Sequence, residues 1–113
     1  MKNFLVVAFI FILNISLDAQ WVNRFNGTGN SSDAAFSIVS DLFNNVYVTG
    51  ISSQNNYTTI KYNTYGVLEW IQNTYGYNGL PNFVPNAVDV FNNVYIAGTI
   101  WSDITYHDCF VAK

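Results

Sequence analysis

One ten-residue stretch occurs twice in the sequence, 48 residues apart. Residues 41–50 read DLFNNVYVTG and residues 89–98 read DVFNNVYIAG, so seven of the ten positions are identical. Internal similarity with a period of about 20–50 residues is typical of repeat architectures, in which one supersecondary unit is copied and stacked. This period constrains the fold more than any other feature of the chain.

Both copies lie within a pattern of short strands joined by polar turns. The sequence predicts strands at 36–40, 46–52, 57–62 and 67–73, then a loop at 75–85 that contains two prolines and two glycines. The pattern restarts with strands at 86–90 and 94–100, a connection at 101–108 and a strand at 109–113. One more strand is predicted at 21–25. Because no helical periodicity extends through residues 20–113, the predicted fold class is all-β.

The repeated polar residues are interpreted as turn formers. Asp bonds the backbone of its own turn, and Asn tolerates the left-handed conformation. The alternative, a calcium loop, requires alternating oxygen ligands that this spacing lacks. Gly66 is expected to have a positive φ in a second tight turn at 63–66. The predicted turn residues are Asp41, Asn44, Asn45, Gly50, Asp89, Asn92, Asn93 and Gly98.

A repeat of 48 residues with four strands is typical of a β-propeller blade. Copies around 36–73 and 86–113 make about two blades' worth of an incomplete ring, whereas a propeller usually closes with about four to eight blades. Two blades alone would leave apolar faces and strand edges uncovered. Further blades are therefore expected, either from sequence beyond Lys113 or from association of chains.

The first nineteen residues have the layout of a secretory signal peptide. Lys2 precedes an uninterrupted apolar run at 4–13, and Ala19 offers a small residue for cleavage before Gln20. The run is shorter than the roughly 20 residues that cross a bilayer. The expected mature region is 20–113, secreted and without a membrane span; an uncleaved anchor is the alternative.

Composition narrows the class of partner. Charged residues make up 10% of the chain and its formal net charge is −3, with no cluster of Lys or Arg. Nucleic acids and anionic membrane surfaces attract proteins through such clusters, so neither is expected as a partner. Cys109 is the only cysteine, which excludes an intrachain disulfide. A small buried strand residue is the preferred interpretation of Cys109, and pairing with another molecule is the alternative.

Several motifs resemble the bacterial SBBP-type β-propeller repeat family of secreted proteins. The matching elements are NNVYVTG at 44–50, NNVYIAG at 92–98, TTIKYNTYGVLEW at 58–70 and DCFVAK at 108–113. The resemblance covers residues from about Trp21 onwards, and it implies a blade scaffold with an extracellular or cell-surface location. Family members often carry many blades. The family has no catalytic motif to transfer to this chain.

The aromatic and titratable residues offer few candidates for a functional site. Trp21, Trp70 and Trp101 are the candidate ligand-binding residues, because an aromatic face can stack on a sugar; packing between blades is the alternative. His107, Asp108 and Cys109 suggest a metal or thiol site, but neighbouring strand residues point to opposite faces, and structural zinc needs four ligands. No catalytic residue, metal ligand or cofactor is predicted.

These observations predict a non-catalytic binding or structural scaffold whose ligand is an unidentified extracellular protein or glycan. Two alternatives stay open. One is a fragment of a carbohydrate-active propeller enzyme, whose paired carboxylates cannot be identified from the sequence. The other is a small two-blade lectin that associates into a ring.

Overall fold

The structure is a computed structural model that describes residues 20–52, 56–74, 84–104 and 106–113. The predicted signal peptide and most of the predicted 75–85 loop lie outside these residues. All regular structure in the described part is β, so the all-β prediction is confirmed. The strands are β1 (Ala34–Ser40), β2 (Val46–Ser52), β3 (Asn56–Tyr62), β4 (Leu68–Thr74), β5 (Asn86–Val88), β6 (Val94–Ser102) and β7 (Tyr106–Ala112).

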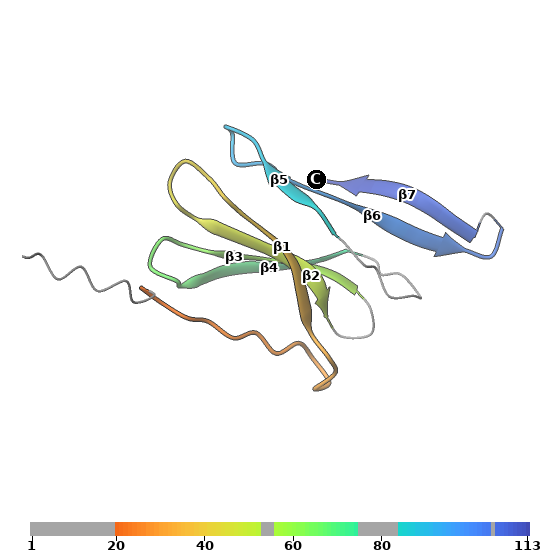
Figure 1. Cartoon of the computed structure of the whole chain (residues 1–113), viewed down its shortest axis with the longest axis horizontal. Helices are drawn as coiled ribbons and strands as arrows, with labels where there is room; N and C mark the ends of the chain where they lie inside the picture. The colour runs from red at the N-terminus through yellow and green to blue at the C-terminus, as the bar shows by residue number, and fades with distance from the viewer. Residues whose placement is uncertain (1–19, 53–55, 75–83, 105) are drawn as a thin grey trace, which may run out of the picture.

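The strands form two antiparallel sheets that follow the chain order (Figure 1). The first sheet has the order β1-β2-β3-β4 and the second has the order β5-β6-β7. Val46 pairs with Ser40 in the first sheet, and Val94 pairs with Val88 in the second. Both members of the first pair lie 48 residues before their counterparts, so the two hairpins share one register.

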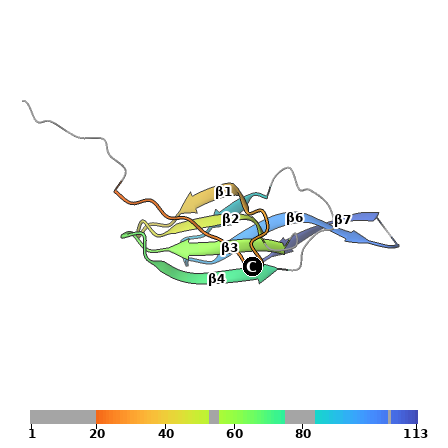
Figure 2. The same ribbon diagram turned by 90° about the horizontal axis from the view of Figure 1, so that it is seen from below.

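Each sheet has two distinct faces because successive strand residues point to opposite sides. In the first sheet, one side carries Val48, Gly50 and Ile60, and we call this side the arm face, because residues 20–33 (the N-terminal arm) cross it. The other side carries Tyr47, Thr49, Ile51, Tyr57 and Thr59, and we call this side the stacked face. The second sheet lies against the stacked face (Figure 2), and its Ile96 and Phe110 pack with Tyr57.

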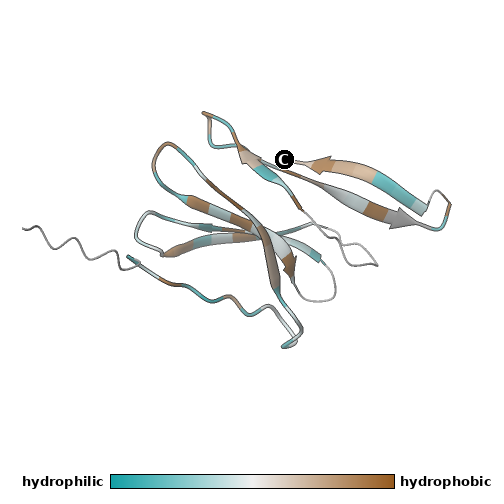
Figure 3. Cartoon of the chain, in the orientation of Figure 1, coloured by the Kyte–Doolittle hydropathy of each residue, from teal (hydrophilic) through white to brown (hydrophobic). Residues whose placement is uncertain are grey.

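The core lies between the two sheets. Tyr57, Val84 and Ile96 are buried there, and Ile51 and Phe110 pack around them. The Tyr57 hydroxyl donates a hydrogen bond of 2.7 Å to the Thr99 carbonyl and accepts one of 3.2 Å from the Thr99 amide. Alternation of apolar and polar residues along the strands, visible in Figure 3, provides this contact surface.

Polar contacts fix the position of β5 against the first sheet. The Asn86 side-chain amide donates to the Tyr47 carbonyl and to Thr49 Oγ1, each at 3.2 Å, and the Ser37 hydroxyl donates to the Val84 carbonyl. The contact between the sheets removes these polar groups from water. Because the groups bond to each other, their burial does not destabilise the contact.

The contact between the sheets joins unlike faces. Ile96 and Gly98 approach the stacked face, and they stand 48 residues after Val48 and Gly50, which belong to the arm face. A Cβ atom on Gly98 would lie 3.0 Å from the Tyr57 ring, so the glycine makes room for the neighbouring sheet. The packing is therefore head to tail, and such packing leaves one uncovered face at each end.

Two sequence predictions are wrong. Residues 21–25 were predicted as a strand because they are rich in aromatic residues and resemble the strand that contains Trp70, but they have no strand pairing. The predicted connection at 101–108 is instead mostly strand, because β6 and β7 continue to pair as far as Ser102 and Tyr106. Intrinsic β-propensity does not provide a partner strand, and the sequence of 101–108 does not reveal that its two halves pair.

Among the described residues, no helix has the length and apolar character needed to cross a membrane.

Candidate functional site

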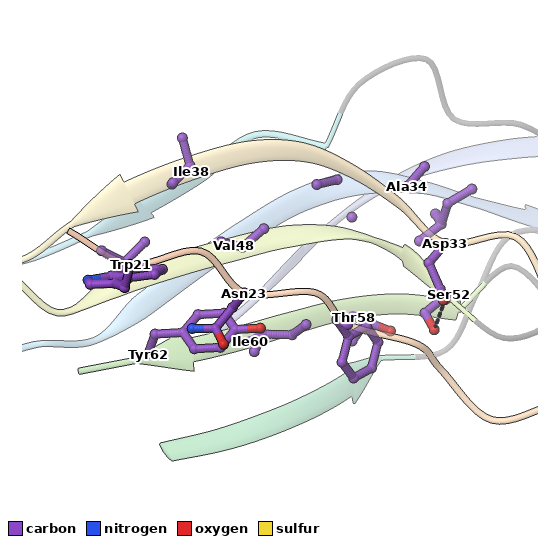
Figure 4. A pocket seen from close by; sticks show the side chains of 15 residues that line it. Trp21, Asn23, Asp33, Ala34, Ile38, Val48, Ser52, Thr58, Ile60 and Tyr62 are labelled. Carbon is purple, nitrogen blue, oxygen red and sulfur yellow. Dashed lines mark hydrogen bonds between the residues drawn. The ribbon is translucent and has the colours of Figure 1, made fainter. Parts of the chain in front are cut away.

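A groove of about 310 Å³ lies between the N-terminal arm and the arm face (Figure 4). Apolar side chains from three strands form its floor, and Trp21, Asn23 and Phe25 of the arm form its outer wall. The floor residues are Ile38, Val46, Val48, Ile60 and Tyr62. Because strand residues of one parity share a face, the sheet presents these side chains together.

Trp21 anchors the arm at one end of the groove. Its indole packs on the Tyr62 ring, with centroids 5.8 Å apart and planes inclined by 38°. The indole N–H donates a 3.3 Å hydrogen bond to the Thr64 carbonyl, and the Asn23 side-chain amide donates to the Gly66 carbonyl. Gly66 has a φ of +77°, and a side chain there would collide with the indole. One face of the Trp21 ring is therefore used in packing.

Asp33 holds the other end of the arm. Its carboxylate accepts hydrogen bonds from the Ser52 hydroxyl and from the Gly27 amide, the latter at 2.9 Å. These two bonds, with that from Ser52 the stronger, lower the pKa of Asp33 below its ordinary value of 3.8. The carboxylate is therefore ionised near neutral pH and serves to close the loop of the arm.

Trp21 and Trp70, two of the three tryptophans predicted to bind a ligand, are not brought together at the groove. Trp70 lies on the opposite side of the first sheet, where its ring centroid is 5.9 Å from that of Tyr47. The Trp101 backbone pairs with His107, and its side chain lies outside the described part. Of the two tryptophans whose side chains are described, Trp21 lines the groove and Trp70 does not.

Asp41, Asn44 and Asn45 form a bonded network in the β1–β2 turn, whereas Gly50 and Gly98, also predicted as turn residues, lie inside β2 and β6. Asp41 Oδ1 accepts hydrogen bonds from the amides of Phe43 and Asn45, at 2.8 and 2.9 Å. Asp41 Oδ2 accepts hydrogen bonds from the Asn45 side chain at 2.8 Å and from the Tyr47 hydroxyl at 3.0 Å. Asn44 occupies the left-handed region with a φ of 62°. All these oxygen contacts come from within the turn and its flanking strand.

The β5–β6 turn repeats this network bond for bond. Asp89 accepts from the amides of Phe91 and Asn93, from the Asn93 side chain and from the Tyr95 hydroxyl, at distances between 2.8 and 3.1 Å. Asn92 has a φ of 63°. The role of Tyr47 and Tyr95 was not predicted, although the presence of a tyrosine at this position in both copies was a usable signal.

The hydrogen bonds determine the charge state of both aspartates. Burial acts to raise the pKa of Asp41, but the bonds from Asn45, Tyr47 and Phe43 together outweigh it, and the pKa falls below 3.8. The Asn93 side chain is the largest cause of the lowered pKa of Asp89. Burial and the Asp41 carboxylate raise the pKa of Tyr47, which therefore stays protonated and donates its hydrogen bond. Both carboxylates are thus committed to structural bonds.

Lys61 completes this network on the stacked face. Its ammonium lies 2.6 Å from the Glu69 carboxylate and 5.6 Å from the centre of the Tyr47 ring. The hydrogen bond to Glu69 is the main cause of the raised pKa of Lys61. Lys113 stands over the Tyr95 ring at 5.7 Å, so the second sheet has the same lysine–tyrosine contact.

His107, Asp108 and Cys109 occupy an exposed stretch of β7, so Cys109 is a strand residue as predicted, but the prediction that it is buried is wrong. Because they are consecutive strand residues, Asp108 points away from the side that His107 and Cys109 share. No group of three or more His, Cys, Asp or Glu side chains in the described part of the chain is arranged to hold a metal ion. This stretch therefore provides no convergent set of metal ligands among the described residues.

The groove can accept an apolar group, whereas its polar atoms hold the arm in place. Asn23 and Asp33, two of the polar side chains that line it, are both hydrogen-bonded within the protein.

Comparison with protein-family models, curated proteins and solved structures gives no match for this chain.

Proposed function

We propose that this chain is a secreted, non-catalytic scaffold whose sheets stack head to tail in the manner of β-propeller blades. The observation that carries the proposal is the contact between unlike faces. The side of the second sheet that bears Ile96 and Gly98 covers the stacked face of the first sheet. Repetition of one such heterologous contact generates a ring when the rotation closes, and an open stack when it does not.

The two outward faces support the same proposal. On the arm face, Ile38 is 70% exposed, and Leu68 and Ile71 are also exposed beside the groove. On the outward side of the second sheet, Val111 is 74% exposed. The arm covers only part of its face. Further copies of the unit, in the same polypeptide or in associated chains, would cover the remaining apolar surface.

Two parts of the proposal, secretion and the likeness to SBBP-type propellers, are supported by the sequence. The layout of residues 1–19 supports export, and the repeated motifs support a bladed scaffold. In such a scaffold, turns and loops at the rim recognise an extracellular protein or glycan, while the stacked sheets hold them rigidly. The bonded turns at Asp41 and Asp89 are suited to this task because their backbones are fixed by hydrogen bonds within each turn.

Light scattering on the purified full chain tests the proposal. We expect an assembly of several chains, and Ile38→Asp should reduce its mass because a charge would be buried at the next contact. Ile104→Asp is the matched control, because Ile104 is 89% exposed in the β6–β7 turn and takes no part in stacking. A well-folded monomer would contradict coverage by associated chains, and equal effects of the two variants would contradict stacking through the arm face.

A further inference from the structure

Three tight turns at one end of the molecule carry large apolar side chains that point into solvent. Leu42 and Phe43 stand on the β1–β2 turn, Tyr65 on the β3–β4 turn, and Val90 and Phe91 on the β5–β6 turn. Each of these five side chains is between 68% and 82% exposed. We call this set the turn end, and Figures 1 and 2 both show the three turns at the same end, opposite the β6–β7 turn.

The folding of the turns does not explain these apolar residues. The bonds in each turn use the side chains of Asp41, Asn45, Asp89 and Asn93 together with backbone amides. The side chains of Leu42 and Phe43 take no part in them, and polar residues would serve equally well at these two positions. Nevertheless an aliphatic residue followed by Phe occurs in both copies, and Figure 3 shows hydrophobic residues beside hydrophilic ones in both turns.

Most backbone amides of the three turns already have hydrogen-bond acceptors within the protein. The amides of Phe43, Asn44 and Asn45 all donate to acceptors of Asp41. The β5–β6 turn has the same bonds to Asp89, and the amides of Tyr65, Gly66 and Val67 donate to Asn63. An amide that is already bonded loses little when its surroundings become apolar, whereas an unbonded amide loses much.

Charge and shape identify the kind of partner. Residues 41–45, 63–67 and 89–93 contain no Lys or Arg, so the turn end has no groups for binding phosphate or anionic lipid. Its five apolar side chains stand on separate turns of two sheets, and none of them lines the groove beneath the arm. A rigid protein partner would need a separate pocket for each turn, whereas a lipid interface deforms around protruding side chains.

We propose that the turn end inserts into the interfacial layer of an uncharged lipid bilayer. Phe, Leu and Val would enter the boundary between headgroups and acyl chains, and Tyr65 would stay at the headgroup level, where aromatic residues with a polar tip are enriched. Asp41 and Asp89, each bonded four times at the base of its turn, would remain on the water side. The proposal does not depend on stacking of the sheets, but it gives the β1–β2 and β5–β6 turns a lipid partner in place of the protein or glycan considered for the rim of the scaffold.

Site-specific fluorescence on the full chain tests this insertion. In a Cys109→Ser background, an environment-sensitive dye is attached at Phe43→Cys, at Phe91→Cys or, as the matched control, at Ile104→Cys in the β6–β7 turn at the opposite end. Vesicles of phosphatidylcholine alone should shift the emission of the first two dyes to the blue and leave the third unchanged. The control also separates insertion of the turn end from tethering by residues 1–19, since tethering alone does not distinguish the two ends.

A second substitution measures the contribution of one side chain. Phe91→Ser in the chain labelled at position 43 should shift the equilibrium towards the non-inserted state by about tenfold, because burial of one Phe favours insertion by roughly that factor. Equal shifts at all three dye positions, no shift at positions 43 and 91, or a shift only with anionic lipid would overturn the proposal. The dyes report insertion whether or not the chains assemble, so failure here is distinguishable from failure of the scaffold proposal.

Discussion

The β1–β2 and β5–β6 turns have the same hydrogen bonds but different surroundings. Asp41 and Asp89 each accept four bonds from equivalent groups, and Asn44 and Asn92 have φ values of 62° and 63°. However, Tyr47 is 1% exposed, whereas Tyr95 is only partly buried. The ten repeated residues therefore determine the conformation of each turn, whereas the neighbouring sheet determines how deeply its tyrosine is buried.

The same contrast appears where the two sheets differ in sequence. Tyr57 pairs with Ile51 in the first sheet, and Cys109 pairs with Thr99 at the equivalent place in the second. Tyr57 is fully buried against the second sheet, but Cys109 is exposed because no described segment covers it. Substitutions at matched positions can therefore separate local effects from stacking effects.

Tyr57→Ala should have the largest effect on stability. It removes a buried ring and two hydrogen bonds to Thr99, so we expect a loss of about 3–5 kcal/mol in the free energy of unfolding. Urea unfolding at a fixed protein concentration measures this loss, which must be compared at one concentration because association contributes to stability.

Cys109→Ala is the matched control for Tyr57→Ala. Because Cys109 is exposed, its substitution should change the free energy of unfolding by no more than about 0.5 kcal/mol. Similar costs for the two variants would mean that burial is not what distinguishes the sheets.

Asp41→Ala should cost less than Tyr57→Ala, about 1–3 kcal/mol, because it leaves the buried Tyr47 hydroxyl and two turn amides without their acceptor. Asp89→Ala should cost less than Asp41→Ala, because Tyr95 is more exposed than Tyr47 and water can replace the lost bonds. Parallel urea titrations compare the two variants. A larger loss for Asp89→Ala would contradict the burial difference between the turns.

Asn44→Ala and Asn92→Ala should cost nearly the same as each other, about 1–2 kcal/mol, because both force an alanine into the left-handed region. Substitution of either residue by Gly should be almost neutral, since Gly adopts that region freely. Thermal unfolding of the four variants provides the measurement. Unequal costs for the two alanine variants would show that the turns are not local units.

The smallest effect concerns pH. Because the pKa values of Asp41 and Asp89 are lowered, their bonds stabilise the folded state above the ordinary value of 3.8, and this contribution is lost as the pH falls below it towards the folded pKa. Asp41→Asn with Asp89→Asn should therefore weaken the acid dependence of the free energy of unfolding. An unchanged acid profile in that variant would assign the dependence to other groups.

Local features of the fold could be predicted from the sequence. Residues 46–52 were predicted as a strand and form β2 with those bounds, and Asn44, Asn92 and Gly66 have the expected positive φ. These features depend on residues close together in the chain, where turn chemistry and side-chain alternation decide the conformation.

Contacts between distant segments could not be predicted in the same way. The position of Trp21 over Tyr62, the bond from Tyr57 to Thr99 and the extension of the β6–β7 hairpin each depend on residues that meet only in the folded chain. Repetition identifies equivalent positions, but it does not say which face of one sheet contacts the next. The candidate groove could not be predicted for the same reason, because its walls come from segments that are distant in the sequence.

Amide hydrogen exchange at Thr99 tests most directly the claim that one sheet packs head to tail on the next. The Thr99 amide donates to the Tyr57 hydroxyl across the contact between the sheets. In Tyr57→Phe, we predict that Thr99 loses its protection from exchange while the turn amides of Asn45 and Asn93 keep theirs, because those bonds are local. Unchanged protection of the Thr99 amide in this variant would contradict head-to-tail packing of the two sheets.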